Sequence, residues 1–361
     1  MKLISVALLL AGSALCQQNV IVYQEAGRFA GWPANHGIWS WGNEIVVGFE
    51  LGQFRQTAGK NHAINYEQPE EHALARSMDG GVTWSIEKPA SLQPPEGTKI
   101  AGVPVAPGGK APVDSPGGIR FDDPNFAMTI RMQDIHIGPS RFYYSYDRGK
   151  TWMGSYKLPD FGQKGIAART DYLVNGPKDC SLFLTAAKSN GKEGRVLEAR
   201  TTDGGKTWKM VAFVTPEPEG SDHAIMPATV RLAKNTLYTA VRYREFIDTY
   251  QSDDNGSNWY RVGRAADDID NPPSLLKLKN DHLVIVYGRR KTPFGIRARI
   301  SKDSGKTWGE EIVLRQDGGG WDLGYVRSVL RPDGKIVSVY YFNTSMDKER
   351  FIAATIWNPE K

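Results

Sequence analysis

The sequence contains almost no cysteine. Its 361 residues include two, Cys16 and Cys180, and Cys16 falls at the end of an apolar N-terminal segment. If that segment is removed, Cys180 is alone and no disulfide can form within the chain. The fold must then be held by packing, which a chain of this size can achieve. We interpret Cys180 as a small buried side chain rather than a nucleophile.

Long apolar runs are also missing beyond the N-terminus, so we expect no transmembrane segment. The N-terminus itself has the pattern of an export signal: Lys2 precedes an apolar stretch at residues 3–12, and Ala14, Leu15 and Cys16 form a small-x-small cleavage site before Gln17. Leu15 is bulky where a lipid-modified cysteine needs a small neighbour, which argues against a lipoprotein anchor at Cys16. We therefore expect a signal peptide at 1–16, a mature domain at 17–361, and a secreted or periplasmic protein.

Strong charge of one sign is absent as well. The formal net charge is +5, and the lysines and arginines are scattered rather than clustered. This distribution is compatible with anionic ligands, but it gives no nucleic-acid footprint. Metal-ligand spacings such as His-x-x-x-His are missing, so we expect neither a metal nor another cofactor. The oligomeric state stays open.

One octapeptide pattern occurs five times. The copies are SMDGGVTW at 77–84, SYDRGKTW at 145–152, TTDGGKTW at 201–208, SDDNGSNW at 252–259 and SKDSGKTW at 301–308. Their first residues, 77, 145, 201, 252 and 301, differ by 68, 56, 51 and 49, a period typical of propellers. The Asp can accept backbone N–H groups of a turn, the Gly supplies a positive φ, and the Trp can pack between neighbouring sheets.

Apolar strands recur between these copies. In the fourth unit we expect strands at 228–232, 236–241 and 247–251, and in the fifth at 274–278, 282–287 and 296–300. Residues 326–356 give three more strands without an octapeptide, and residues 20–23 can supply the missing fourth. The pattern therefore predicts an all-β fold, a single six-bladed β-propeller closed by the N-terminal strand. The octapeptide resembles the Asp box of the sialidase superfamily over essentially the whole mature chain.

A functional site on this fold should collect the starts of first strands and the ends of second strands, on the rim opposite the Asp boxes. Several of these positions are arginines, which suit bidentate capture of a carboxylate. As substrate-binding candidates we take Arg131, Arg169, Arg242, Arg289, Arg297, Arg327 and Asp123.

The resemblance to sialidases implies three arginines that clamp a sugar carboxylate and a tyrosine nucleophile. Arg242 and Arg297 (or Arg289) match two clamp positions, and Tyr325 matches the nucleophile. The chain departs from the family in three places. Asn35 and His36 replace an early Arg-Ile-Pro motif. Met226 stands where a Glu activates the tyrosine. The loop before the first box offers Arg55, His62, Glu67, Glu70, Glu71 and His72 but no Asp.

Other residues can take over the missing roles. His36 can act as acid or base, or can be a structural histidine that fixes the first strand. Asp171 can activate Tyr325 or orient a sugar hydroxyl, or can form a salt bridge between blades. His62 or Glu71 can donate a proton to the leaving group. The catalytic candidates are thus Tyr325, His36, Asp171, His62 and Glu71.

Three functions fit these residues. The leading hypothesis is an exported glycoside hydrolase that releases a terminal, acidic sugar from a glycan or polysaccharide. The second is a polysaccharide lyase on the same scaffold, in which Tyr or His abstracts a proton while arginines neutralise a uronate. The third is a lectin-like module that binds a sugar without turnover. The fold hosts many functions, so residues of the site must decide among them.

Overall fold

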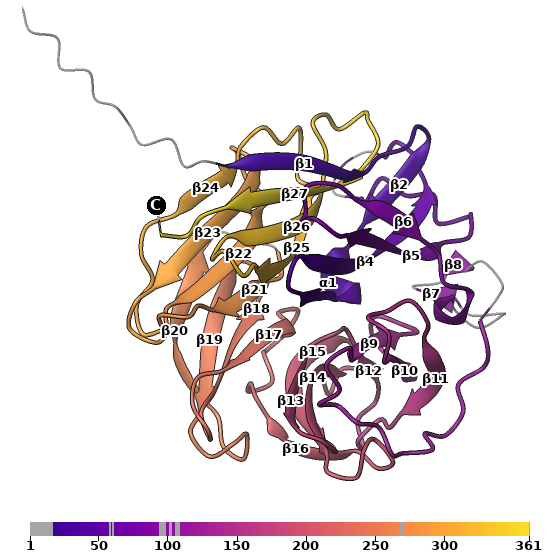
Figure 1. Cartoon of the computed structure of the whole chain (residues 1–361), viewed down its shortest axis with the longest axis vertical. Coiled ribbons are helices and arrows are strands. Elements are labelled where there is room, and N and C mark those ends of the chain that lie inside the picture. Colours follow the sequence, from indigo (N-terminus) through magenta and orange to yellow (C-terminus); the bar gives the residue numbers. More distant parts are fainter. Residues whose placement is uncertain are drawn as a thin grey trace, which may run out of the picture.

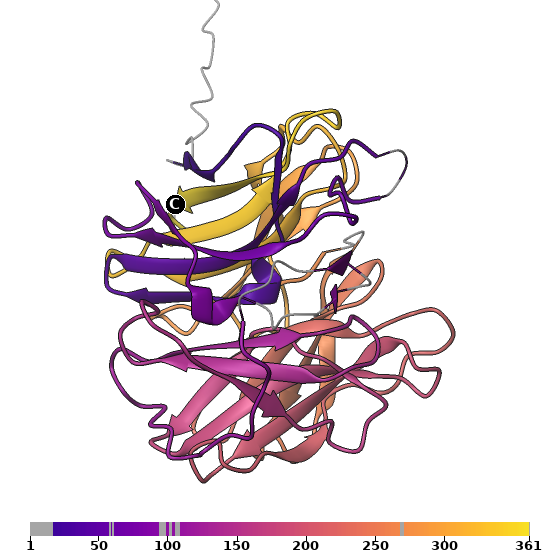
Figure 2. The same cartoon turned by 90° about the vertical axis from the view of Figure 1, so that its right-hand side faces the viewer.

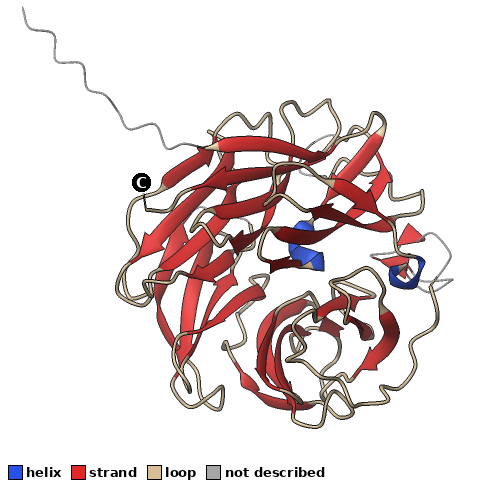
Figure 3. Cartoon of the chain, in the orientation of Figure 1, coloured by secondary structure: helices blue, strands red, loops and turns tan. Residues whose placement is uncertain are grey.

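The computed structural model describes residues 17–57, 59, 61–93, 99–100, 103–104, 109–267 and 271–360. The expected signal peptide, with Cys16, lies outside the described residues. Within the described part, antiparallel sheets are arranged radially as the six blades of a propeller (Figure 1), and helix is confined to short turns (Figure 3). The side view in Figure 2 shows the same sheets turned by 90°. The prediction of an all-β six-bladed propeller is confirmed.

The first two blades are irregular. Blade 1 contains β2 (Arg28–Gly31), α1 (Pro33–His36), β3 (Ile38–Trp41), β4 (Glu44–Gln53), β5 (Glu71–Ser77) and β6 (Ser85–Glu87). A 3-10 turn, η1 (Ala90–Leu92), and a small hairpin of β7 (Lys99–Ile100) and β8 (Val103–Pro104) lead to blade 2, which contains β9 (Ala127–Met132), β10 (Ser140–Ser145) and β11 (Met153–Leu158). Helix α1 interrupts the innermost strand of blade 1 and lies near the middle of the molecule (Figure 1).

The remaining blades follow the expected order more closely. Blade 3 contains β12 (Ile166–Ala167), β13 (Tyr172–Gly176), β14 (Asp179–Ala187), β15 (Glu193–Thr201) and β16 (Lys209–Phe213). Blade 4 contains β17 (Ile225–Arg231), β18 (Leu237–Arg242), β19 (Phe246–Ser252) and β20 (Tyr260–Asp267). Blade 5 contains β21 (Ser274–Lys277), β22 (Leu283–Arg289), β23 (Gly295–Ser301) and β24 (Ile312–Arg315).

The N-terminal strand closes the ring. In blade 6 the order is β1 (Gln18–Tyr23), β27 (Phe351–Trp357), β26 (Ile336–Phe342) and β25 (Gly324–Leu330). Val20 pairs with Ala354 in an antiparallel register, and Figure 1 shows β1 beside β27. The two ends of the domain are therefore joined in one sheet, as the strand count in the sequence predicts.

The Asp boxes form the hairpin turns that their residues predict. In the fifth box, Asp303 accepts the backbone N–H of Thr307 at 2.9 Å and the hydroxyl of Thr307 at 2.6 Å. Ser301 accepts the N–H of Gly305 at 2.8 Å, and Gly305 has a φ of 88°. In the other four boxes the Asp accepts the corresponding backbone N–H, and in the fourth box the side-chain amide of Asn258 replaces the threonine hydroxyl. Among the described residues no group of three or more His, Cys, Asp or Glu is arranged to hold a metal ion.

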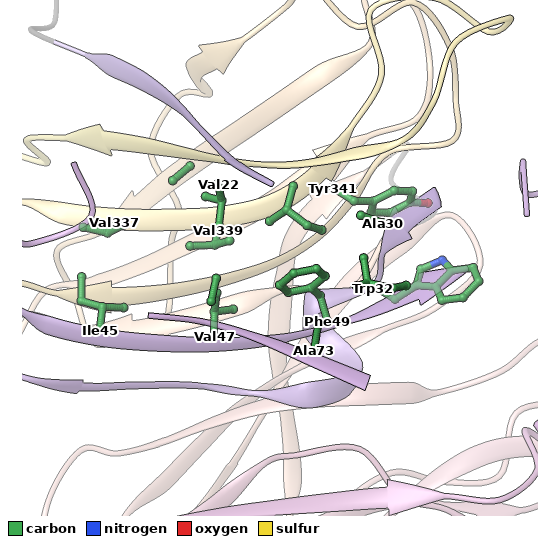
Figure 4. Packing of buried hydrophobic residues seen from close by; sticks show 14 of the residues in the cluster. Val22, Ala30, Trp32, Ile45, Val47, Phe49, Ala73, Val337, Val339 and Tyr341 are labelled. Carbon is green, nitrogen blue, oxygen red and sulfur yellow. The ribbon is translucent and has the colours of Figure 1, made fainter. Parts of the chain in front are cut away.

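The hydrophobic core lies between neighbouring blades. Figure 4 shows the layer between blades 1 and 6, where Val47 and Phe49 of β4 face Val339 and Tyr341 of β26. Cys180 is fully buried in the cluster between blades 2 and 3, and burial raises the pKa of its thiol, as a small core residue would show. Side chains along a strand point alternately to its two faces, and so into the layers on either side of the blade. The ends of the strands lie outside these layers, at the rims.

The described chain holds no helix with the length and apolar character that a membrane crossing requires.

One buried carboxyl group outside the rims affects stability. Glu198 on β15 is fully buried, and it lies so close to Gly256 of the fourth Asp box that a Cβ at that glycine would overlap its carboxylate. Burial raises the pKa of Glu198 to about 7, although Arg200 and Arg231 act in the opposite direction. The folded protein therefore binds a proton at Glu198 more tightly than the unfolded chain does.

We expect Glu198→Gln to remove a pH-dependent component of stability. A carboxyl whose pKa rises from 4.5 to about 7 on folding stabilises the fold fully below pH 4.5, and this contribution is lost as the pH rises through 7. Between these limits the free energy of unfolding should fall by roughly 2–3 kcal/mol more in the wild type than in the variant. Urea denaturation at both pH values measures this, with Glu219→Gln, at an exposed position, as control. Parallel profiles for wild type and Glu198→Gln would contradict it.

Candidate functional site

A pocket of about 200 Å³ opens on the rim opposite the Asp boxes. The strand pairings place it there: Ile45 of β4 pairs with Ser77 at the first box, whereas Glu50, at the other end of β4, pairs with His72. The lining residues come from blades 1, 2, 3 and 6 and are Trp32, Asn35, His36, Glu50, His62, Tyr66, Glu70, His72, Arg131, Met132, Ile135, Ala168, Arg169, Glu193 and Tyr325. Five of the residues taken from the sequence, His36, His62, Arg131, Arg169 and Tyr325, therefore share one pocket.

The helical turn α1 brings His36 to the pocket. Trp32, before the turn, has a φ of 57°, and Gly37, after it, has a φ of 109°. A Cβ on Gly37 would lie 2.8 Å from the Thr170 methyl group, so only glycine allows this close approach. The carbonyl of His36 accepts hydrogen bonds from the hydroxyls of Thr129 at 2.9 Å and Thr170 at 2.7 Å. Blades 2 and 3 thus fix the backbone that carries the imidazole.

Two carboxyl groups and two imidazoles form a buried cluster at one wall. His36 Nε2 lies 3.0 Å from Glu50 Oε2, and His72 Nε2 lies 3.4 Å from Glu50 Oε1. Burial works against ionisation of Glu50, but His72 and hydrogen bonds outweigh it and lower the Glu50 pKa. Burial and the neighbouring Glu50 raise the pKa of Glu70 to about 10. At neutral pH the pair therefore carries one negative charge, on Glu50, and one proton, on Glu70.

Arg131 lines the pocket and carries a guanidinium that is only partly hydrogen-bonded. Its Nε donates to the Thr129 hydroxyl at 2.9 Å, whereas Nη1 and Nη2 are buried and have no hydrogen-bond partner among the described residues. The side chain is 4 % exposed. Its cross-strand neighbour on β10 is a second buried arginine, Arg141. Burial, with Arg141 adding to it, lowers the pKa of Arg131 to about 9, so the group is still cationic at neutral pH. A buried cation in this state favours the entry of an anion.

His62 is held by a buried carboxylate. Its Nδ1 lies 2.6 Å from Asp322 Oδ1, and Asp322 also accepts from the backbone N–H of Ala63, the hydroxyl of Tyr341 and Nε of Arg350. Burial would raise the pKa of Asp322, but His62 and Arg350 outweigh it and hold the pKa below its ordinary value. A carboxylate at Nδ1 keeps the hydrogen on that nitrogen, which leaves Nε2 to exchange a proton with a ligand.

Tyr325 lies on a strained backbone at the start of β25. Its φ is 50°, and its N–H donates to Asn271 Oδ1 at 2.7 Å. Arg242 donates from Nη1 to the Tyr325 hydroxyl oxygen at 3.1 Å. Met226, where the sialidase resemblance would have a glutamate, instead places its sulfur 3.6 Å from the same Nη1. Arg242 therefore holds the hydroxyl of Tyr325 but is not among the residues that line the pocket.

Two arginines expected at the pocket lie away from it. Arg297 on β23 is buried against Glu311 at 3.1 Å and donates to the carbonyls of Pro293, Ile296 and Arg315. Arg289 lies 3.8 Å from the same Glu311. Neither arginine lines the pocket where the sequence analysis expected it, and both guanidinium groups pair with a carboxylate of their own blade. Arg169 does line the pocket, but it pairs with Glu193 at 2.9 Å.

Asp171 and Arg327 line a second hollow of about 340 Å³, formed by the inner strands around the propeller axis. Arg327 donates to the carbonyls of Ala34 and Thr170 at 2.7 and 2.6 Å. Asp171 accepts the Thr229 hydroxyl at 2.9 Å, and burial raises its pKa to about 7 while Arg327 lowers it. Neither residue lines the pocket. These positions correct the prediction that Arg327 contacts the substrate and that Asp171 contacts Tyr325 or a sugar hydroxyl.

The sequence analysis also placed Glu71 and Asp123 at the functional site, whereas neither residue lines the pocket. Glu71 begins β5 directly after the inward-facing Glu70, so it points outward and forms ion pairs with Arg28 and Lys88. Asp123 lies on the Asp-box rim, where it accepts the N–H of Asn125 beside Arg148 of the second box. The reason is that the strand after Asp123, Ala127–Met132, occupies the second position of its blade and therefore begins at this rim, whereas Asp123 was taken as the start of a first strand.

Sequence reasoning missed Asp322, Trp32, Tyr66 and Glu193, and it gave no role to Glu50, Glu70 or His72. The alternation of β5 was a usable signal, since Glu70 and His72 are two residues apart and share a face. Asp322 had no comparable signal, because it reaches His62 from a loop 260 residues away in the chain.

Comparisons with known proteins agree with this architecture. Residues 126–338 match the family described as BNR repeat-like domain. A search of curated proteins finds no match. A protein of unknown function from Dyadobacter fermentans superposes with a TM-score of 0.70 at 20% identity, covering 94% of this chain and 97% of that one. An α-L-arabinanase from Penicillium chrysogenum, complexed with arabinobiose, gives 0.62 at 13% identity, with 95% and 98% covered.

The Trypanosoma rangeli sialidase, in complex with sialic acid, gives a TM-score of 0.60 at 12% identity; the match covers 95% of this chain and 59% of that protein. At these identities the likenesses show a shared propeller fold.

Proposed function

We propose that this chain, which belongs to the BNR repeat-like domain family, is a glycoside hydrolase that releases a terminal, acidic sugar from a glycan or polysaccharide. The observation that carries the proposal is the convergence in one pocket of three chemically distinct groups. These are the open guanidinium of Arg131, the carboxylate-held imidazole of His62 and the hydroxyl of Tyr325. Together they can hold an anion, move a proton and attack carbon.

In the first step, Tyr325 acts as the nucleophile. Its oxygen bonds to the anomeric carbon while the bond to the leaving oxygen breaks, and the Nε2 proton of a protonated His62 passes to that oxygen. The phenol proton passes to the carboxylate of Glu50, which also lines the pocket, directly or through water. Arg242, which donates to the Tyr325 oxygen at 3.1 Å, stabilises negative charge on it. A neutral nucleophile avoids repulsion of an anionic sugar.

In the second step, water releases the sugar. Neutral His62 now takes a proton from the water as its oxygen attacks the anomeric carbon, and the bond to Tyr325 breaks. The proton held at Glu50 returns to the tyrosine oxygen, which restores the starting state. Because Asp322 stays hydrogen-bonded to Nδ1, the imidazolium formed at His62 is stabilised in both steps.

The same groups support a second candidate, a polysaccharide lyase. An arginine on the carboxylate of a uronate stabilises the enolate that forms when a base removes the neighbouring proton, and His62 or Tyr325 can serve as that base. The open fork of Arg131 is the observation that favours this alternative.

Incubation of the mature protein with sialosides, uronic-acid glycans and deoxy-sugar glycosides, read by product mass, tests the proposal. A hydrolase adds one water across each bond that it cleaves. A lyase adds none and creates a double bond that absorbs in the ultraviolet. Saturable binding with no product after long incubation would instead identify a binding module and overturn both enzymatic proposals.

We also infer export. The pattern at residues 1–16 supports it, and β1 begins at Gln18, directly after the expected cleavage site. Sequencing the N-terminus of the protein recovered outside the cytoplasm should give Gln17 as the first residue. An intact Met1 in that fraction would contradict cleavage.

A further inference from the structure

The charge balance of the pocket leaves one cation without a counter-ion. On the anionic side, Glu50 is the ionised member of the carboxyl pair, and His36, His72 and the nearby Arg141 already surround it. Glu193 pairs with Arg169 at 2.9 Å. The guanidinium of Arg131 is therefore the buried positive charge that these carboxylates do not neutralise, and a buried charge of this kind is costly until an anion reaches it.

The shape of Arg131 selects a planar anion. Thr129 holds the guanidinium at Nε, and the Thr129 hydroxyl is itself tied to the carbonyl of His36. The two terminal nitrogens are buried and have no hydrogen-bond partner among the described residues, and Arg131 is one of the residues that line the pocket. Two parallel N–H donors match the two oxygens of a carboxylate. A lysine at this position would keep the charge but could not reproduce the paired bonds.

A single open fork is a different arrangement from a three-arginine clamp. The other five arginines taken from the sequence as ligand-binding are engaged within the fold. Their partners are Tyr325 for Arg242, Glu193 for Arg169, Glu311 for Arg289 and Arg297, and the carbonyls of Ala34 and Thr170 for Arg327. The pocket, with a volume of about 200 Å³, opens at the rim. A hexuronate needs one fork for its single carboxylate, whereas the resemblance to sialidases implies three arginines for a sialic acid.

We infer that the terminal sugar is a hexuronate, and that the fork of Arg131 alone holds its carboxylate. This inference rests on the proposed function, since it names the sugar which that same pocket takes. It assigns substrate recognition to blade 2, at the end of β9, and leaves Arg242 as a residue that positions Tyr325.

Matched ligands test the inference without altering the protein. Aryl α- and β-hexuronides are compared with their methyl esters, with the corresponding neutral hexosides and with an aryl sialoside. We expect kcat/KM for the better hexuronide to exceed that for its methyl ester by roughly 100-fold or more, because esterification removes the charge and one acceptor but keeps the ring. Binding of the free sugars, followed by calorimetry, should show the same order.

Variants of Arg131 separate the fork from the charge. Arg131→Lys should lower kcat/KM for the hexuronide by roughly 10–100-fold, and Arg131→Met should abolish the preference over the neutral hexoside. Arg120→Met, at an exposed position on the Asp-box rim, is the control. Thermal unfolding shows whether each variant folds. If a variant does not fold, the comparison of ligands on the wild-type protein still tests the inference.

The outcomes distinguish this inference from the proposed function. Cleavage of neutral hexosides or sialosides in preference to hexuronides would overturn the hexuronate but leave the hydrolase standing. Equal turnover of a hexuronide and its methyl ester would overturn the role of Arg131. Failure of every glycoside to be cleaved or bound would overturn the proposed function as well.

Discussion

Tyr325→Phe should reduce turnover by at least about 10³-fold, because it removes the oxygen that attacks the anomeric carbon. The phenyl ring keeps its edge contact with Tyr341, at 5.9 Å between ring centroids, and its place beneath Arg290. The fold should therefore be unchanged, and thermal unfolding should show this. Turnover of an aryl glycoside of the accepted sugar, measured to substrate exhaustion, gives the size of the loss.

A covalent intermediate gives the sharper form of this test. A fluorinated analogue of the sugar with a reactive leaving group slows the second step, so mass spectrometry of the digested protein should find the sugar on Tyr325. Tyr260→Phe, on an exposed tyrosine beside the fourth Asp box, should react as the wild type does. A sugar attached elsewhere, or a Tyr325→Phe variant with full activity, would exclude the tyrosine mechanism.

His62→Gln should lower kcat/KM by roughly 10²–10⁴-fold, the range for loss of a general acid and base. The loss should be largest for a leaving group that needs a proton, such as a second sugar, and smallest for an activated phenol that departs without one. This dependence on the leaving group separates proton donation from a purely structural role, which would slow both substrates alike.

Asp322→Asn should reproduce part of the same loss, since an amide can no longer hold the hydrogen on Nδ1 of His62. Asp322 also binds Tyr341, Arg350 and the N–H of Ala63, so we expect this variant to be less stable than His62→Gln. For His62→Gln, the matched control is His282→Gln, which lies on the turn at the opposite rim. Equal losses for both leaving groups in His62→Gln would contradict the assignment of the proton donor.

The fold could be predicted because each Asp box carries its own local physics. Ser301, Asp303, Gly305 and Thr307 form the same turn wherever they recur, so five copies at regular spacing specify the blades without long-range information. The closing strand was predictable for the same reason, because blade 6 lacked one strand and the N-terminus supplied one. Blade 2 does not follow this pattern, since its described residues include only three strands and Ala127–Met132 takes the second position.

The site was only partly predictable because strand ends specify a rim but not the direction of a side chain. Arg131 and Arg297 both come from rim ends of strands, yet one opens into the pocket while the other binds Glu311 within its own blade. Glu70 and Glu71 are neighbours in the chain, and the pleat alone sends them to opposite faces. The Asp322 partner of His62 depends on two loops meeting in space, which no local pattern encodes.

A crystal structure of His62→Gln with a bound hexuronide would show how the pocket holds the sugar. We expect the sugar carboxylate on Nη1 and Nη2 of Arg131, the anomeric carbon facing the Tyr325 oxygen, and the leaving group pointing toward residue 62. A carboxylate bound by Arg289 or Arg297, or a sugar seated in the axial hollow beside Asp171, would contradict this arrangement.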